Sequence, residues 1–93
     1  MKTIKDYNKY ITGIRAFNKG MGVVFRFDNG YGLSVVCHSY SYGTNEELFE
    51  IAVLKFTSDD NWRLCYDTPI TGYVLGHQSD EDLIDVIEKA IAL

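Results

Sequence analysis

Phe27-Asp28-Asn29-Gly30-Tyr31 is the stretch of this sequence that decides the fold. Asn-Gly tolerates positive φ at both positions, which a two-residue type I′ hairpin turn requires. The flanking runs 23–27 and 33–38 are rich in β-branched and aromatic residues, as strands are. The stretch therefore predicts a β-hairpin whose two strands are joined by Asn29 and Gly30.

The pairing register of this hairpin has two solutions. A strict two-residue turn places Phe25 opposite Ser34, and both faces of the strand pair then become partly apolar. Either the sheet is covered on both sides, or a β-bulge near Gly30 or Gly32 shifts the pairing by one residue. The alternation of residue types does not decide between them.

Two further strands are predicted after a loop over 40–47. The first spans 48–57 and alternates apolar with other residues, and the second spans 62–66 after a turn at 58–61. Pro69 removes a backbone donor, so we expect the sheet to end at 67–69. A single helical turn is expected over 72–75, stopped by Gly76.

Both ends of the chain predict helices. Ser79 is a candidate N-cap for a C-terminal helix that carries one apolar stripe. The stripe consists of Leu83, Val86, Ile87, Ala90 and Ile91, widened by Ile84. At the N-terminus, a second set fits helical spacing: Ile4, Tyr7, Ile11, Ile14 and Phe17. Gly13 costs a helix about 1 kcal/mol relative to Ala, so a short N-terminal helix is favoured and a strand near Ile14 is the alternative.

The predicted fold class is therefore α+β, in a single domain over 1–93. It has a four-stranded antiparallel meander, a C-terminal helix packed on one face and a short N-terminal helix. We expect the opposite face to be covered by the N-terminal segment or by a second copy of the chain in a homodimer.

Composition narrows the class of protein. The 93 residues are 46% hydrophobic and 24% charged, which is ordinary for a folded globule. The first residues lack a signal-peptide pattern, and no run approaches the ~20 apolar residues of a membrane span. Two cysteines are too few for a disulfide framework. We expect a cytoplasmic protein with free thiols and no membrane partner.

No residue pattern predicts catalysis, a metal or a cofactor. Cys37, His38, Cys65 and His77 match no zinc spacing, and neighbours on a strand point to opposite faces. A cysteine in an apolar strand is usually a small hydrophobic residue rather than a nucleophile. The carboxylates at 59–60 and 80–82 have structural reasons to occur in a turn and at a helix start. The sequence therefore predicts a protein that is not an enzyme.

Charge is sorted along the chain. Six of the nine basic residues lie in 1–27, interleaved there with aromatic residues, whereas 28–93 contains twelve of the thirteen acids. Basic and aromatic side chains together suit nucleic acid, although a net charge of −4 repels phosphate at long range. The acidic part suits a basic groove on another protein, with exposed Tyr40, Tyr42 or Trp62 as anchors.

Three segments carry a resemblance: 29–36, 49–54 and 66–71, which read NGYGLSVV, FEIAVL and YDTPIT. They resemble small uncharacterised proteins encoded in bacteriophage genomes. The resemblance implies a context, because short acidic phage accessory proteins often block host functions such as CRISPR and restriction nucleases. It transfers no functional residues to this chain.

Together these observations predict a non-enzymatic phage accessory protein. It would bind and inhibit a host defence protein, such as a CRISPR or restriction nuclease, in the host cytoplasm through an acidic surface. The alternative is a small nucleic-acid-binding regulator that uses the basic N-terminal segment. The predicted partner-binding residues are Tyr40, Tyr42, Glu46, Glu47, Glu50, Asp59, Asp60, Asp82 and Asp85.

Overall fold

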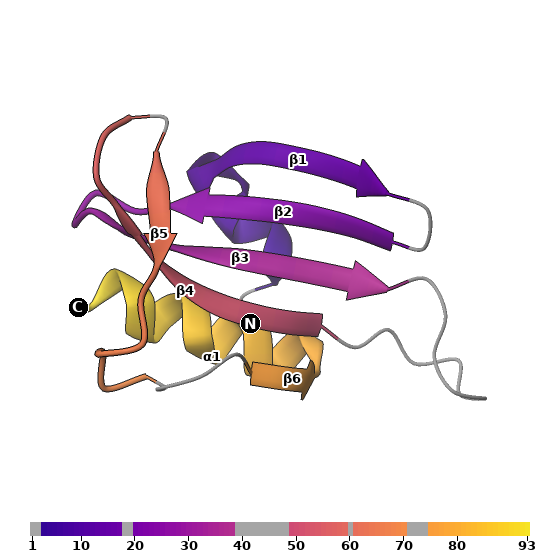
Figure 1. Ribbon diagram of the computed structural model, residues 1–93. Coiled ribbons are helices and arrows are strands. Elements are labelled where there is room, and N and C mark those ends of the chain that lie inside the picture. Colours follow the sequence, from indigo (N-terminus) through magenta and orange to yellow (C-terminus); the bar gives the residue numbers. More distant parts are fainter. Residues whose placement is uncertain (1–2, 18–19, 39–48, 60, 71–74) are drawn as a thin grey trace.

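An antiparallel sheet with a C-terminal helix packed on it forms the body of the computed structural model (Figure 1). The structure describes residues 3–17, 20–38, 49–59, 61–70 and 75–93. In these ranges the elements are η1 (Ile4–Tyr10), β1 (Ile11–Phe17), β2 (Gly20–Arg26), β3 (Tyr31–His38), β4 (Phe49–Phe56), β5 (Trp62–Leu64), β6 (Leu75–Gln78) and α1 (Asp80–Ile91). The predicted α+β class is confirmed.

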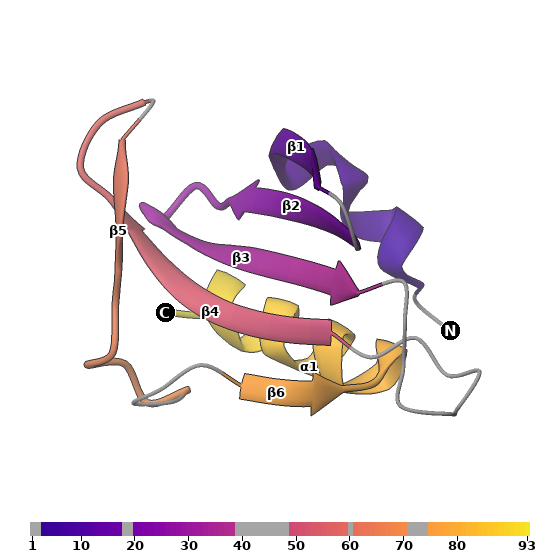
Figure 2. The ribbon, with the colours of Figure 1, turned by 45° about the vertical axis from the view of Figure 1, so that its right-hand side comes forward.

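The strands follow one another across the sheet in chain order from β1 to β5, and β6 joins beside β4. β5 pairs with residues 54–56 of β4, whereas β6 pairs with positions 49 and 51 of the same strand. The two short strands therefore lie against different halves of β4, as Figure 2 shows. The predicted meander is extended by β1 at one edge and by β6 at the other.

A bulge in the β2–β3 hairpin fixes the register. The Phe27 amide donates to the Tyr31 carbonyl at 2.8 Å, and the Gly30 amide donates to the Phe27 carbonyl at 3.2 Å. Gly30 has φ 86°, the left-handed conformation that follows a type I turn in a three-residue hairpin loop. Phe25 therefore pairs with Leu33 rather than with Ser34. The strict two-residue turn is wrong, and the bulged alternative is confirmed.

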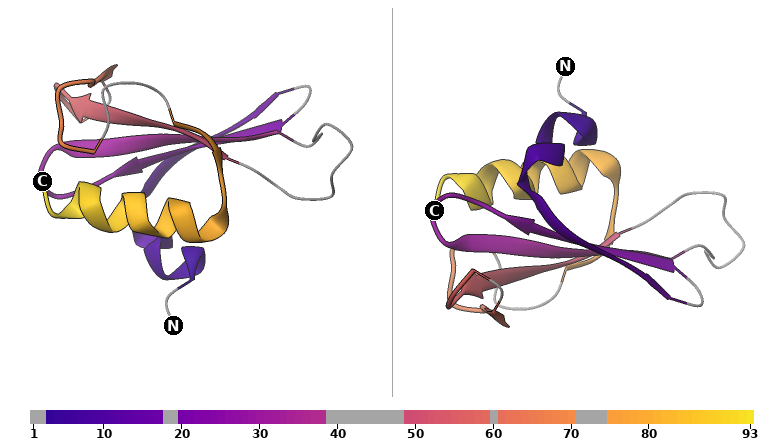
Figure 3. Two further views of the ribbon diagram at one scale, coloured as in Figure 1. Left: turned by 90° about the horizontal axis from the view of Figure 1, so that it is seen from below. Right: turned by 90° about the horizontal axis from the view of Figure 1, so that it is seen from above.

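This register collects the large apolar side chains on one face. α1 and η1 lie together on that face, which we call the helix-covered face (Figure 3). Its buried core consists of Tyr7, Phe25, Phe27, Leu33, Val35, Ile51, Val53, Cys65, Leu83, Val86, Ile87 and Ala90. The predicted stripe of α1 packs here. The expectation that the N-terminal segment covers the other face is wrong, because η1 packs beside α1.

Polar contacts fasten the two helices in place. Ser79 Oγ accepts from the Asp82 amide at 3.2 Å, and Asp82 Oδ2 accepts from the Ser79 amide at 3.0 Å, so the predicted N-cap is a complete capping box. The Tyr7 hydroxyl of η1 donates to the Glu88 carboxylate of α1. At the other end of α1, the amide of Asn29 donates to the carbonyl of Ala90 at 2.8 Å. The hairpin turn thus also closes the C-terminus of the helix.

Several boundaries differ from the sequence predictions. The N-terminal helix η1 is a 3-10 helix that ends at Tyr10, and the strand alternative near Ile14 is also present as β1. The sheet does not end at Pro69, because β6 pairs with β4 afterwards. Leu75, the last residue of the helical turn predicted over 72–75, belongs to β6, as does Gly76. Residues 72–74 of that turn and the loop predicted over 40–47 lie outside the described residues. None of the helices in the described part of the chain is long and apolar enough to span a membrane.

Candidate binding surface on the opposite sheet face

The face of the sheet turned away from α1, the opposite face, is covered only in part. This face carries the half-buried side chains of Val24, Ser34 and Val36. Val24 pairs with Ser34, and Val36 pairs with Gly22, so these positions alternate with the core residues of β2 and β3. Towards β4 the face is closed, and Leu54 is fully buried there. The exposed part therefore extends over β1, β2 and β3 and along β5.

Three large apolar side chains are exposed at alternate positions along β5 and just after it. Trp62, Leu64 and Tyr66, which we call the apolar strip, are 38%, 44% and 45% exposed. Trp62 pairs with Phe56 and Leu64 with Leu54, which places this strand's alternate residues on the opposite face. Scattered exposed apolar residues are normal, but a row of three marks a candidate contact surface.

Cys65, between Leu64 and Tyr66 of the strip, points into the core and is hydrogen-bonded. Cys65 is buried, its amide donates to the Val53 carbonyl at 2.8 Å, and its thiol donates to Asp67 Oδ1 at 2.8 Å. This hydrogen bond and burial raise the pKa of the Cys65 thiol, and the same bond lowers the pKa of the Asp67 carboxyl. This shift is opposite in direction to the lowered pKa of nucleophilic cysteines.

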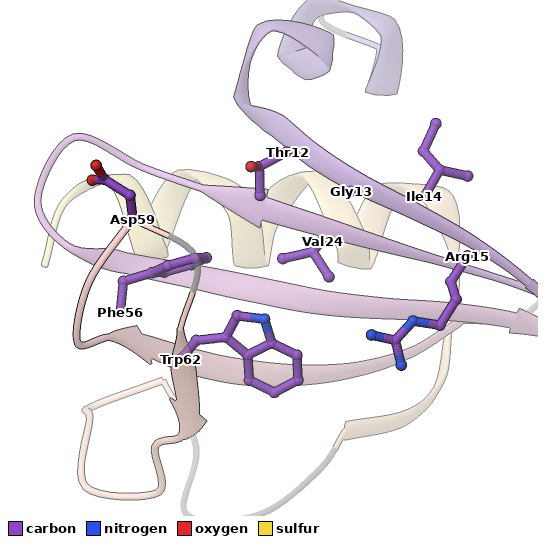
Figure 4. Close-up of a pocket in the computed structure, with 8 residues that line it drawn as sticks. All are labelled: Thr12, Gly13, Ile14, Arg15, Val24, Phe56, Asp59 and Trp62. Atoms are coloured by element: carbon purple, nitrogen blue, oxygen red, sulfur yellow. The ribbon is translucent and has the colours of Figure 1, made fainter.

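A pocket of about 260 Å³ lies between β1, β2 and the β4–β5 hairpin (Figure 4). Phe56 and Trp62 enter it from the hairpin and face Val24 of β2, with Arg15 at one end and Asp59 at the other. The remaining lining residues are Thr12, Gly13 and Ile14. The pocket is thus apolar in the middle and charged at its two ends.

The two charged ends differ in what they contact. Asp59 Oδ1 lies 3.1 Å from a guanidinium nitrogen of Arg26, and that guanidinium also lies over the Phe56 ring, 5.2 Å from its centroid. Within the described ranges the Arg15 side chain has no hydrogen bond or ion pair. Arg15 is therefore the positive group that the pocket offers to a ligand.

The predicted partner-binding residues do not meet on one surface. Tyr40, Tyr42, Glu46, Glu47 and Asp60 lie outside the described residues. Glu50 is exposed on β4, and Asp59 follows β4 in the turn that contributes to the pocket. Asp82 and Asp85 are on α1, across the sheet, where Asp82 closes the capping box and Asp85 pairs with Lys89 at 2.9 Å.

No group of three or more metal-ligating side chains occurs among the residues that the structure describes. The side chains of Cys37, His38 and His77 fall outside that description. No protein-family model, curated protein or solved structure matches the chain. The surface is therefore interpreted from its own chemistry.

The pocket and most of its residues were missed by the sequence analysis. Phe56 and Trp62 flank a predicted turn, so their proximity across a hairpin was a usable signal. No sequence signal placed Arg15 in this pocket, because the N-terminal segment was predicted as a helix and a strand was only the alternative. Trp62 was the one residue of this surface expected to be an exposed anchor.

Proposed function

We propose that this chain is a non-enzymatic binding protein that docks on another protein through the apolar strip. The observation that carries the proposal is the exposure of Trp62, Leu64 and Tyr66 on a chain that packs the apolar stripe of α1 into its core. Aromatic side chains at the centre of a contact supply most of its binding energy when they lose water. A strip of this kind is a suitable anchor.

The net charge of the chain favours a basic partner. Asp67, an exposed residue, directly follows Tyr66, whereas Asp59 beside Trp62 is already paired with Arg26. The whole chain carries a net charge of −4. Complementary charge speeds encounter and selects partners, while the apolar anchors hold the complex together.

The partner that we propose is a host defence protein such as a CRISPR or restriction nuclease. Such enzymes hold nucleic acid in a positively charged channel, which an acidic domain with apolar anchors can occupy. The resemblance to phage accessory proteins supports this choice. Inhibition by occupation needs no catalytic group on this chain.

DNA-cleavage assays with a panel of purified CRISPR and restriction nucleases test the proposal. We expect inhibition of at least one enzyme, weakened by salt and lost in the double variant Trp62→Ser/Leu64→Ser. Met21→Ser is the matched control, since Met21 is 50% exposed but lies on β2 away from the strip. Absence of inhibition, or equal inhibition by both variants, contradicts the proposal.

Two further measurements separate the alternatives. Light scattering at micromolar concentration detects a homodimer, which would bury the strip in a second copy instead. A gel shift with the native chain and with the variant Lys5→Gln/Lys9→Gln, which keeps the buried Tyr7 of η1, tests the nucleic-acid alternative. Retarded DNA that depends on those two lysines would favour that alternative.

A further inference from the structure

The pocket at the edge of the apolar strip has the dimensions of a small-ligand site. Its volume of about 260 Å³ lies just below the range of roughly 300–1,000 Å³ that holds drug-sized molecules. A pocket of this size suits one ring with one polar group. It does not suit a dinucleotide or a second protein's helix.

The middle of the pocket is suited to a flat apolar group. Phe56 and Trp62 form one wall, and Val24 faces them from β2 (Figure 4). Arg26 lies over the Phe56 ring, which helps to hold this ring in position. Aromatic rings attract one another in offset or edge-to-face arrangements beyond the area that they bury. An aromatic ring is therefore the body that best matches these walls.

The charge of Arg15 at one end of the pocket selects the polar group of the ligand. Arg26 is engaged by Asp59, whereas Arg15 has no ion pair among the described residues. A guanidinium presents two parallel N–H donors that match the two oxygens of a carboxylate. A phosphate monoester carries nearly two charges, which one free arginine neutralises only in part. A carboxylate needs only the single arginine.

We propose that this pocket binds a single-ring aromatic carboxylate, with the ring against Trp62 and Phe56 and the carboxylate on Arg15. This site does not depend on the docking of another protein by the strip. Two kinds of ligand carry an aromatic ring with a carboxylate: a free aromatic acid, and the C-terminal Phe or Tyr of a peptide chain.

The chain provides its own reporter for this proposal, because Trp62 is its single tryptophan. We expect phenylacetate to change the Trp62 fluorescence saturably, with a Kd on the order of 1 mM for a ligand of this size. Phenylacetamide keeps the ring and removes the charge, and we expect it to bind at least about fivefold more weakly. Equal binding by the amide would overturn the proposal.

Substitutions then locate the carboxylate. Arg15→Gln should weaken phenylacetate binding about tenfold, and Arg15→Lys should fall between it and the native chain because lysine keeps the charge but not the fork. Arg63→Gln is the matched control: Arg63 is an exposed arginine of β5 that does not line the pocket. Unfolding midpoints confirm that each variant is folded. If Arg15→Gln and Arg63→Gln bind alike, the assignment of Arg15 is wrong.

Peptides distinguish the two sources. A short peptide ending in Phe with a free carboxylate is compared with the same peptide amidated at its C-terminus. Tighter binding of the free peptide than of phenylacetate identifies a chain terminus as the ligand, and the reverse order identifies a free acid. Tighter binding of cytidine monophosphate than of either, or no saturable change with any of them, overturns the proposal.

Discussion

The helix-covered face and the opposite face are made by the same strands, yet one is buried in the core and the other is partly exposed. On the first, Phe25, Leu33 and Val35 are buried under α1 and η1. On the second, their sequence neighbours Val24, Ser34 and Val36 are partly exposed. The difference follows from the single extra residue at Gly30, which aligns the large side chains of β2 and β3 on one side. Stability is concentrated on one face, which leaves the other available for binding.

The largest difference between the faces is expected from truncating one side chain on each. Ile87→Ala opens a cavity in the core, where Ile87 is 0% exposed, and should cost about 2–5 kcal/mol. Leu64→Ala removes a side chain that is already 44% exposed and should cost roughly 1 kcal/mol or less. Urea unfolding of both variants measures this, and equal losses would show that the strip is structural.

A glycine on the opposite face should give the next largest effect. A Cβ at Gly32 would lie 2.1 Å from the Phe25 carbonyl oxygen and 2.7 Å from the Phe56 ring, so Gly32→Ala should cost about 1–3 kcal/mol through backbone shifts. Gly76→Ala is the control, because no atom lies within 4 Å of its Cβ position. That control should stay within about 0.5 kcal/mol. A tolerated Gly32→Ala would contradict the close approach of β2, β3 and β4 here.

The contact from the turn to the helix should contribute a moderate amount. Asn29 donates to the Ala90 and Ile91 carbonyls at 2.8 and 3.2 Å and accepts from the Tyr31 amide at 3.0 Å. Asn29→Ala should therefore cost about 1–2 kcal/mol in unfolding free energy. Asn61→Ala is matched to it, since among the described residues the side-chain amide of Asn61 donates to Ser58 in its own exposed turn and not to another element. Equal losses would mean that the contact with α1 adds nothing.

The smallest effect is a dependence on pH at the start of α1. Hydrogen bonds from the Ser79 backbone and side chain lower the pKa of the Asp82 carboxyl. A lowered pKa in the fold stabilises the protein above the unfolded value near 3.9, and this contribution is lost as pH falls through the folded pKa. Asp82→Asn should therefore be less stable than the native chain at neutral pH, with the gap closing as pH falls below the unfolded value and through the lowered folded pKa. A gap that is independent of pH would exclude this origin.

The local features of the fold were predictable, and those that depend on distant contacts were not. The hairpin at Asn29-Gly30, the cap at Ser79 and the apolar stripe of α1 are each specified by neighbouring residues. β6 has only four residues, including Gly76, and forms because β4 offers it a free edge. The N-terminal segment changes from helix to strand after Tyr10, because η1 packs against α1 whereas β1 pairs with β2. Both contacts are with residues distant in sequence.

The candidate site was less predictable than the fold. The pocket combines residues from β1, β2 and the β4–β5 hairpin, which meet only after the sheet has formed. The proposed acids that the structure describes fall on both sides of the sheet, where Asp59, Asp82 and Asp85 each contact a group in this chain. Charge along a sequence does not indicate which charges share a face.

The Asn29 contact also bears on the order of folding. The β2–β3 hairpin joins residues close in sequence, and such hairpins form within about 1–10 μs. The bond from Asn29 to Ala90 joins residues 61 positions apart, so we expect it to form after the transition state. Stopped-flow measurements on Asn29→Ala should then show faster unfolding and an almost unchanged folding rate. The β2–β3 turn would then form early in folding, and its contact with α1 would slow the unfolding of the native state.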